Sequence, residues 1–533
     1  MNILFIAPPY PFEEIPAIPL GLCYAAAACE MAGATVTVLD LIVTEYTSAK
    51  LKQTIDDCSP VMIGATSVTL NVNRATSLLK EAKQYCPSAV TVIGGPHVTF
   101  DYTSILNTFP EIDIVVLGEG EVTLQSLLPV LQDRNSWECI EGIAFRKEGN
   151  IIVTPKRPFI ENLDSFPLPA RHLLPISKYL ALGVPANIIT SRGCPNNCIF
   201  CVGRRMVGYK VRYRSIANVL DEVEQLLAYG FPLINIADDL FTSNRKRVIS
   251  FCNAIHAKGL KFIWSAFTRV NTIDESLLEI MKAAGCIAVS FGVESGNPEI
   301  LESLQKNITL NQAREAAAIC KKVQMSVIAS FIIGLPGESP ETLQETKAFA
   351  ESLGVRFGYH ILAPFPGTTV RENIESYDLQ ILSNDWDKYD ANHAIVQTSK
   401  IRPDELEAFT KTVDDVIQEI IKEYKEHYQN GLATLEERSF IEYQDRMKLI
   451  FQILSNDLIE HILPIQIHDQ KPEEILISYL VEKTGMTPQA TQRIVHIICE
   501  SGLLGYTIQD GFLQWFWTSN DHLLNRSKKT LAA

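Results

Sequence analysis

The sequence predicts an α/β protein with two parallel-sheet domains and a mostly helical C-terminal region that ends like a winged helix. Two observations predict it. Short runs rich in Ile and Val alternate with helical patterns over residues 1–140 and again over residues 186–400, the order that parallel sheets with covering helices require. After residue 401 this alternation gives way to long amphipathic helical patterns.

Residues 1–140 are predicted to form a doubly wound parallel sheet. The expected strands are NILFIA, TVTVLD, VMIGAT, VTVIGG and IDIVVLG, and helices such as LGLCYAAAACEMAG and NRATSLLKEAKQYC separate them. Ligands of such sheets bind beyond the carboxyl ends of the strands. The loops there are APPYPFEE, TSVTLNVN, GGPHVTF and GEGEVT, which are rich in glycine, proline and hydroxyl residues.

Residues 141–185 are predicted to connect the two sheet domains. GIAFRKEGNIIVTP has the pattern of a small β-hairpin that turns at residues 148–150. The proline-rich RPFIENLDSFPLPARHLLP that follows is typical of an extended linker.

Residues 186–400 are predicted to form a partial (β/α) barrel of six strand–helix units. The expected strands are ANIITS, LINIAD, KFIWSAF, AVSFGVES, SVIASFIIGLP and GYHILAPFPG. In barrels of this kind the loops after the strands carry the chemistry. The loop around YHILAPFPGTT is a candidate wall for an apolar or planar substrate.

Residues 401–533 are predicted to begin with one long amphipathic helix and to end with helix, turn and β-ribbon, as in a winged helix. Basic and acidic residues are equal in number from 471 to 533, so a packing or lid role is favoured over nucleic-acid binding. The aromatic residues 515–517 are expected in the core of the ribbon.

Composition narrows the classes of partner. The net charge of -15 opposes nucleic-acid binding. No run of 18 apolar residues predicts a membrane span, and the N-terminus lacks the basic segment of a signal peptide. We expect a cytoplasmic enzyme with a small-molecule substrate, in which the 12 cysteines are not a disulfide framework.

Three of those cysteines, Cys194, Cys198 and Cys201, follow the pattern C-x3-C-x2-C directly after a predicted strand. Zinc sites usually take four ligands in two pairs, and no second pair lies nearby. Iron–sulfur cubanes also take thiolates, normally four. With three thiolates one iron of a cubane has no protein ligand, and an open metal position is where a reactant binds.

This motif on the first loop of a barrel resembles the radical SAM enzymes. The resemblance implies a [4Fe–4S] cluster on Cys194, Cys198 and Cys201 whose open iron binds the amino and carboxylate groups of S-adenosylmethionine. In that family the reduced cluster cleaves S-adenosylmethionine to methionine and a 5′-deoxyadenosyl radical. The electron would come from a donor such as flavodoxin or ferredoxin.

The same resemblance implies contacts to S-adenosylmethionine along the barrel. Phe200 would pack on the adenine, and Asp238 and Asp239 would accept from the amino group, although NIADD departs from the family's Gly-Gly-Glu pattern. The remaining candidates lie after the third, fourth and fifth strands: Ser265, Arg269 (for the carboxylate), Glu294, Ser295, Gly334 and Pro336.

The first domain, placed before such a barrel, resembles the cobalamin-binding domain of the B12-dependent radical SAM class. The tail of a corrin needs a slot between strand ends, close backbone approach and polar donors. Candidate contacts are Pro9, Tyr10, Ser67, Thr69, Gly94, Gly95, His97, Gly118 and Glu119. Because D-x-H-x-x-G is absent, we expect no histidine below the cobalt. His97 is expected to contact the nucleotide tail or the loop, and the lower corrin face is expected to meet residues 69–73.

The resemblance implies a C-methyltransferase that acts on an unactivated carbon of a small-molecule or natural-product substrate. Cobalamin would carry a methyl group from one S-adenosylmethionine, and a second would supply the radical. The alternative is an oxidative cyclase or ring-rearranging enzyme that uses the same cofactors without methyl transfer. A methylthiotransferase would need a second cluster, for which Cys23, Cys29 and Cys58 are the candidates, but two of these fall in a predicted helix. A cobalamin-based sensor would bind without cleavage.

Overall fold

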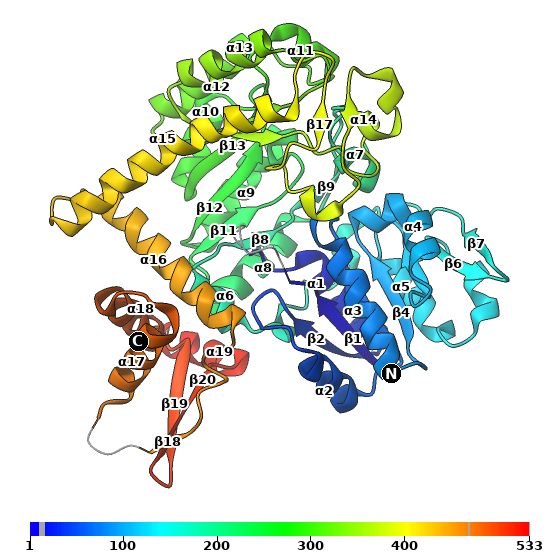
Figure 1. The fold of residues 1–533 in the computed structure, drawn as a ribbon, viewed down its shortest axis with the longest axis vertical. Coiled ribbons are helices and arrows are strands. Elements are labelled where there is room, and N and C mark those ends of the chain that lie inside the picture. Colours follow the sequence, from blue (N-terminus) through cyan, green and yellow to red (C-terminus); the bar gives the residue numbers. More distant parts are fainter. Residues whose placement is uncertain (10–15, 467–469, 532–533) are drawn as a thin grey trace.

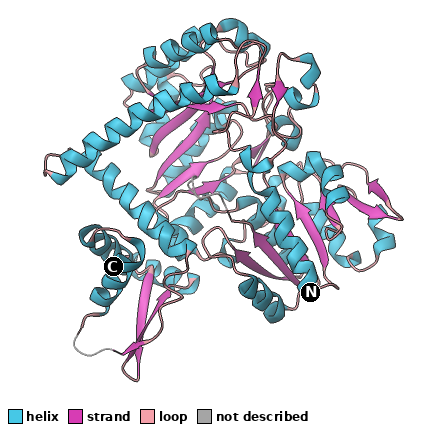
Figure 2. Ribbon diagram, in the orientation of Figure 1, coloured by secondary structure: helices cyan, strands magenta, loops and turns pink. Residues whose placement is uncertain are grey.

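The computed structural model describes residues 1–9, 16–466 and 470–531 (Figure 1). An N-terminal α/β domain, a six-stranded barrel sheet and a helical C-terminal module follow one another along the chain. Figure 2 shows both large sheets with helices against their faces. The predicted fold class is confirmed.

The sheet of the first domain has the strand order β2-β1-β3-β4-β5-β6-β7, and its first five strands are parallel. Alternate residues of a strand point to opposite faces, so both faces need an apolar cover. The strands are β1 (Asn2–Ala7), β2 (Thr35–Asp40), β3 (Met62–Thr66), β4 (Val90–Gly94), β5 (Ile114–Val116), β6 (Ile143–Lys147) and β7 (Asn150–Val153).

Five helices supply this cover. In β1, Ile3 and Phe5 belong to one buried cluster, together with residues of α1 and α5, whereas Leu4 and Ile6 belong to a second one with residues of α2, α3 and α4. The helices are α1 (Leu20–Met31), α2 (Ser48–Cys58), α3 (Val72–Tyr85), α4 (Pro96–Thr108) and α5 (Glu121–Leu127). The carboxyl ends of the parallel strands therefore remain the place for a ligand.

The predicted hairpin is present as β6 and β7, but it belongs to the first sheet and not to the linker. β6 pairs antiparallel with β5, with Val115 opposite Ala144. Ile143 and Phe145 are buried in the core of the first domain. The hairpin joins the sheet because it pairs the free edge of β5 and buries its own apolar side chains there.

The barrel sheet has the order β15-β14-β13-β12-β11-β8, all parallel, and β8 and β15 are not paired, so the barrel is partial as predicted. Its strands are β8 (Ala186–Ile188), β11 (Leu233–Ile236), β12 (Ile263–Thr268), β13 (Cys286–Glu294), β14 (Ser326–Ile333) and β15 (Arg356–Ile361). Its helices are α8 (Ile216–Tyr229), α9 (Arg245–Lys258), α10 (Glu275–Ala283), α11 (Pro298–Ser303), α12 (Leu310–Lys322) and α13 (Pro340–Ser352). A short helix α14 (Thr369–Glu372) and a two-strand ladder of β16 (Gln380–Ile381) and β17 (Val396–Gln397) follow.

The C-terminal module starts with α15 (Pro403–Gln429), the predicted long helix, and returns along α16 (Leu435–Ser455), which the prediction missed. The winged-helix-like end has α17 (Pro472–Thr484) and α18 (Pro488–Glu500), then β19 (Leu504–Gln509), β20 (Phe512–Trp517) and α19 (Asn520–Leu531). β18 (Ile465–Gln466) adds a third strand to the ribbon. Trp515 is buried as expected, but Phe516 is 44% exposed.

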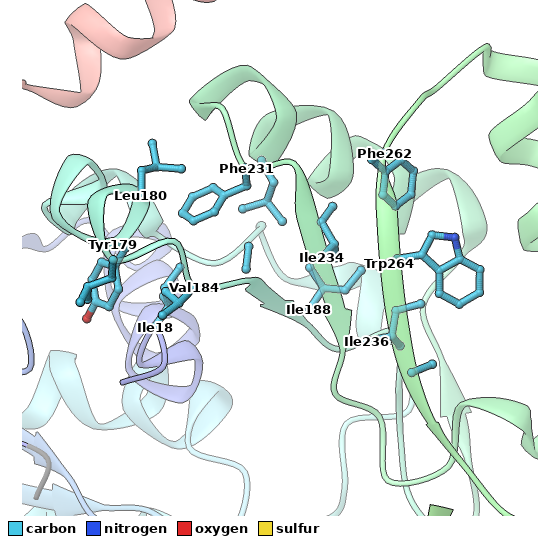
Figure 3. Packing of buried hydrophobic residues seen from close by; sticks show 14 of the residues in the cluster. Ile18, Tyr179, Leu180, Val184, Ile188, Phe231, Ile234, Ile236, Phe262 and Trp264 are labelled. Atoms are coloured by element: carbon cyan, nitrogen blue, oxygen red, sulfur yellow. The ribbon is translucent and has the colours of Figure 1, made fainter. Parts of the chain in front are cut away.

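One buried cluster runs through the barrel, α6 (Ile176–Leu182) and the C-terminal module. Figure 3 shows Ile18 of the first domain beside Tyr179 and Val184, with Ile188, Ile234 and Trp264 of the barrel further along the same cluster. The domains therefore share packed apolar contacts, which fixes the strand ends of the first domain relative to the barrel. None of the described helices is long and apolar enough to cross a bilayer.

Candidate functional site

The loop with the three cysteines begins after β8 and is closed at its base by a short ladder. β9 (Ser191–Arg192) pairs antiparallel with β10 (Arg212–Tyr213), and the N–H of Cys194 donates to the carbonyl of Gly208 at 3.1 Å. Gly193 has φ +116°, and a Cβ there would lie 2.4 Å from the carbonyl oxygen of Lys210. Only glycine fits this entry into the loop.

Asp238 holds the strand that leads into this loop. Its Oδ1 accepts from the backbone N–H groups of Thr190 and Ser191 at 2.5 and 3.1 Å, and its Oδ2 accepts from their hydroxyls at 2.6 and 2.7 Å. Burial raises the pKa of this carboxyl. Since these four bonds use the acceptor sites of the carboxylate, the prediction that Asp238 receives an amino group is corrected: it is a positioning residue.

The change Asp238→Ala is expected to lower the iron content of the reconstituted protein to less than half of the wild-type value. Two buried N–H groups and two hydroxyls lose their acceptor, which costs at least about 2 kcal/mol and frees the loop base. Iron per chain after anaerobic reconstitution is the measurement. Asp221→Ala, which removes an exposed carboxylate of the same domain, is the control. Unchanged iron in Asp238→Ala would show that the loop holds its shape without this anchor.

The three sulfurs lie among hydrogen-bond donors. Cys194 Sγ accepts from Asn196 Nδ2 at 3.4 Å, Cys201 Sγ from the N–H of Gly203 at 3.4 Å, and Cys198 Sγ from Arg269 Nη1 at 3.8 Å. Such donors stabilise thiolates and tune the potential of an iron–sulfur cluster. Because thiolates are the metal-binding form, cluster binding must displace the protons of these thiols.

Three thiols are the kind of donor that an iron–sulfur cluster takes. In the described part of the chain, no three His, Cys, Asp or Glu side chains converge as the ligands of one metal ion. A cubane places each thiolate on a different iron, so its ligands lie further apart than those of one ion. Cys23 and Cys29 are buried in α1 with pKa values raised to about 12, which leaves them poor ligands for a second cluster.

All three cysteines line a cavity of about 530 Å³ at the carboxyl ends of β11, β12 and β13. Five of the residues predicted to contact S-adenosylmethionine also line it: Phe200, Asp238, Asp239, Arg269 and Glu294. Glu294 has φ +72° and is ion-paired with Lys306, while Arg269 donates to the Lys306 carbonyl. The cavity thus joins three thiols, an aromatic ring and groups of both charges.

Four of the predicted contacts are not brought to this cavity. Ser265 donates to Asn235 Oδ1 at 3.0 Å, lower in the barrel. Ser295 is buried against Thr346 of α13 at 3.2 Å. Gly334 and Pro336 are absent from the cavity lining, and a Cβ on Gly334 would face Leu406 and Val396. Their local partners place these residues in the packing around the site.

The structure adds three basic residues that the sequence analysis missed. Lys306 lies 5.7 Å from the centre of the Phe200 ring and lines the cavity together with Arg204 and Arg205. Arg205 is ion-paired with Glu372 at 3.0 Å. Arg204 and Arg205 begin three residues after the last cysteine, so their position in the sequence was a signal for the site. Lys306 gave no such signal, because it belongs to the loop after α11, far from the cysteines in sequence.

A second cavity, of about 330 Å³, lies at the carboxyl ends of β3, β4 and β5 and reaches the barrel. Gly94, Gly95, Gly118 and Glu119 line it, as predicted contacts of the corrin, together with apolar residues of α1. Gly95 has φ +117°, and a Cβ there would lie 2.2 Å from the Ser67 carbonyl oxygen. A narrow apolar slot floored by glycine backbone fits the nucleotide tail of a corrin.

Other residues predicted to contact the corrin are occupied elsewhere. His97 is buried, lies 3.1 Å from the Thr69 hydroxyl and meets the Trp386 ring edge-on at 4.7 Å. Ser67 Oγ donates to the Gly94 carbonyl at 3.3 Å, and the carbonyl of Pro9 accepts from Arg74. None of these residues lines the second cavity. Tyr10 lies outside the described residues.

The two cavities have a common wall. Asp239 lines both, and the short helix α7 (Gly203–Val207) gives Arg204 and Arg205 to the cavity of the cysteines and Met206 and Val207 to the other. Asp239 Oδ2 accepts from the N–H of Gly193 at 3.3 Å. The carboxyl group of Asp239 and the short helix α7 therefore separate the two cavities.

Glu119, a predicted corrin contact, also joins the domains. Its carboxylate accepts from Arg212 at 2.8 and 2.9 Å, from Arg192 at 3.1 Å and from the N–H of Ile160 at 2.9 Å. These bonds lower its pKa against the opposing effect of burial. Since Arg192 stands two residues before Cys194, this ion-pair cluster fixes the cysteine loop against the first domain. The side chain of Glu119 is thus a clamp that also lines the cavity, and its contact with the corrin stays a prediction.

Comparison with protein families gives two matches. Residues 188–350 match the Radical SAM superfamily, and residues 15–128 match the B12 binding domain. The first match covers the cysteine loop and the strands that line its cavity, and the second covers four of the five parallel strands of the first domain.

Comparison with individual proteins extends the likeness. The chain is 37% identical over 374 residues to an uncharacterized methyltransferase of Pyrococcus horikoshii, covering 70% of this chain and 81% of the relative. It is 33% identical to the anaerobic magnesium-protoporphyrin IX monomethyl ester cyclase of Rubrivivax gelatinosus, over 66% of this chain and 65% of that protein. The solved structure of the cobalamin-dependent S-adenosylmethionine radical enzyme OxsB has the same fold, with a TM-score of 0.68 and 16% identity over 99% of this chain and 83% of its own.

Proposed function

Since this chain belongs to the cobalamin-dependent radical SAM methyltransferases, we propose that it methylates an unactivated carbon of a small-molecule or natural-product substrate. The observation that carries the proposal is the common wall: the cavity of the cysteines and the glycine-floored slot meet at Asp239 and α7. A substrate held there reaches both cavities without leaving the protein, and such positioning is worth several kcal/mol of a barrier.

When bound, the cluster and the corrin supply a 5′-deoxyadenosyl radical and a transferable methyl group. We assign the cluster to Cys194, Cys198 and Cys201, and S-adenosylmethionine to Phe200, Asp239, Arg269 and Glu294. Phe200 offers a ring face for the adenine. Arg269 offers a cation, and Asp239 an acceptor for an amino group. Gly94, Gly95 and Gly118 let the tail of the corrin approach the backbone.

The products test the proposal. Turnover of the holoenzyme with its substrate and a reduced flavodoxin or ferredoxin as the electron donor is expected to give S-adenosylhomocysteine, 5′-deoxyadenosine and methionine. Both nucleosides are measured by chromatography with mass detection. An extract of small molecules from a strain that lacks the protein is the source of candidate substrates. Sustained formation of deoxyadenosine without any S-adenosylhomocysteine would exclude methyl transfer.

That excluding result would favour the second candidate, an oxidative cyclisation or ring rearrangement with the same cofactors. The observation that favours it is the 33% identity to the magnesium-protoporphyrin ester cyclase. The two functions share both cavities and differ in whether the methyl group reaches the substrate, so the ratio of the two nucleosides decides between them.

A further inference from the structure

The concave face of the barrel sheet presents large apolar side chains that the described part of the chain leaves exposed. Ile263 and Phe267 of β12 are 41% and 47% exposed, and Ile287 of β13 and Ile328 of β14 are each 44% exposed. Their sequence neighbours Trp264, Ala266, Val327 and Ala329 point to the other face and are buried. An apolar patch of this kind inside a catalytic domain marks a binding surface.

The strand register arranges part of this face as a row. Phe267 pairs with Ser290, Ser290 with Ile328, and Ile328 with Arg356, so the four side chains cross β12 to β15 side by side. Three steps between neighbouring strands span about 14 Å. Phe267 and Ser290 also line the cavity of the cysteines. The row therefore begins beside the cavity of the cysteines and ends at the first residue of β15, the edge strand of the sheet.

The far end of the row carries a free positive charge. Arg356 is exposed, and no described carboxylate lies within ion-pair distance of its guanidinium. Beside it, a Cβ placed on Gly358 would meet no atom within 4 Å, so the space above β15 is open. Between Phe267 and Ile328 stands only the small Ser290. We call this exposed row, from Phe267 to Arg356, the trough.

We propose that this trough binds the substrate, and that the substrate has an apolar body with a carboxylate or phosphate group about 14 Å from the carbon that reacts. The proposal names the chemical class of the substrate and rests on the proposed function. Continuity with the cavity of the cysteines places the reacting carbon beside Phe267. Charge complementarity places the anion at Arg356, because a guanidinium pairs well with either group.

Binding without turnover tests the trough. The probe is the fluorescence of 1-anilinonaphthalene-8-sulfonate on the protein loaded with cluster and cobalamin, with decanoate, decyl phosphate and decanol as competitors. We expect wild-type protein to bind the probe and both anions to displace it. Ile328→Asp and Gly358→Trp are expected to weaken probe binding at least tenfold, by adding a charge and by filling the trough. Ile508→Asp, at a 54% exposed position of the β-ribbon, is the control.

Arg356→Gln separates the charge from the apolar row. It is expected to weaken both anions about tenfold and to leave decanol unchanged. The preference between decanoate and decyl phosphate identifies the anionic group. Retained cobalamin absorbance shows that each variant is folded.

Equal probe binding in wild type, Ile328→Asp and Gly358→Trp would overturn the proposal. So would a wild-type dimer that Ile328→Asp converts to a monomer, because the face would then be an interface between copies of the chain. Neither result involves S-adenosylhomocysteine, so a failure of the trough and a failure of methyl transfer are distinguishable.

Discussion

Cys198→Ala is expected to abolish the formation of 5′-deoxyadenosine while cobalamin stays bound in the first domain. Loss of one of three thiolates leaves two irons of a cubane without protein ligands, and cluster binding fails. The cavity beside β3, β4 and β5 contains no cysteine of the loop, so the slot for the corrin tail is intact. Deoxyadenosine after reduction with dithionite, iron per chain, and cobalamin absorbance after desalting are the three measurements.

The matched control for this variant is Cys139→Ala, which removes an exposed thiol of the first domain. It is expected to change none of the three readouts. Simultaneous loss of iron and cobalamin in Cys198→Ala would contradict the separation of the two cavities. It would mean that the cysteine loop, through the wall of α7 and Asp239, also shapes the slot of the first domain.

Glu119→Ala is expected to lower the stability of the holoprotein by about 3–5 kcal/mol, because it leaves the buried guanidinium of Arg212 without its carboxylate. The Arg212 side chain is only 3% exposed, whereas Arg192 keeps its second ion pair, with Glu121. The loosened ladder of β9 and β10 should also lower the iron content. The midpoint of urea unfolding, followed by tryptophan fluorescence, is the measurement.

The pH dependence of this clamp has a defined sign. The pKa of Glu119 is lowered in the folded protein, so its contribution to stability is present above the unfolded value of about 4.3 and is lost as the pH falls through the folded value. The difference between wild type and Glu119→Gln should therefore shrink in acid. Glu161→Ala removes an exposed ion pair with Lys210 and is expected to leave the midpoint unchanged. Equal midpoints for Glu119→Ala and Glu161→Ala would refute the clamp.

Most of the scaffold was predictable because its signals are local. The apolar runs at β1, β3, β4 and β5 are bounded by glycine and proline, and the helices between them have the expected period. The three cysteines were predictable for the same reason, since their spacing lies within eight residues of one loop. The hairpin was found as a hairpin, but its attachment to β5 depends on a strand edge that no local pattern reveals.

The roles of single polar residues were less predictable because their partners are distant in sequence. Asp238 meets residues 47 and 48 positions earlier, and Glu119 meets arginines 73 and 93 positions later. His97 was expected to contact the nucleotide tail or a loop. The ring that packs against it, Trp386, belongs to the segment after the last barrel strand. A short carboxylate beside a strand end looks the same in sequence whether it binds a ligand or holds a loop.

The wall of α7 and Asp239 has a kinetic consequence. An intermediate that forms in one cavity and is consumed in the other crosses only one helical turn. Its escape to solvent competes with this short move and not with diffusion through water. The thickness of the wall then sets the fraction of turnovers that reach product. Enlarging Val207, which lines the slot and is only half-buried, should shift the partition between completed and abandoned turnovers before it alters either cavity's affinity.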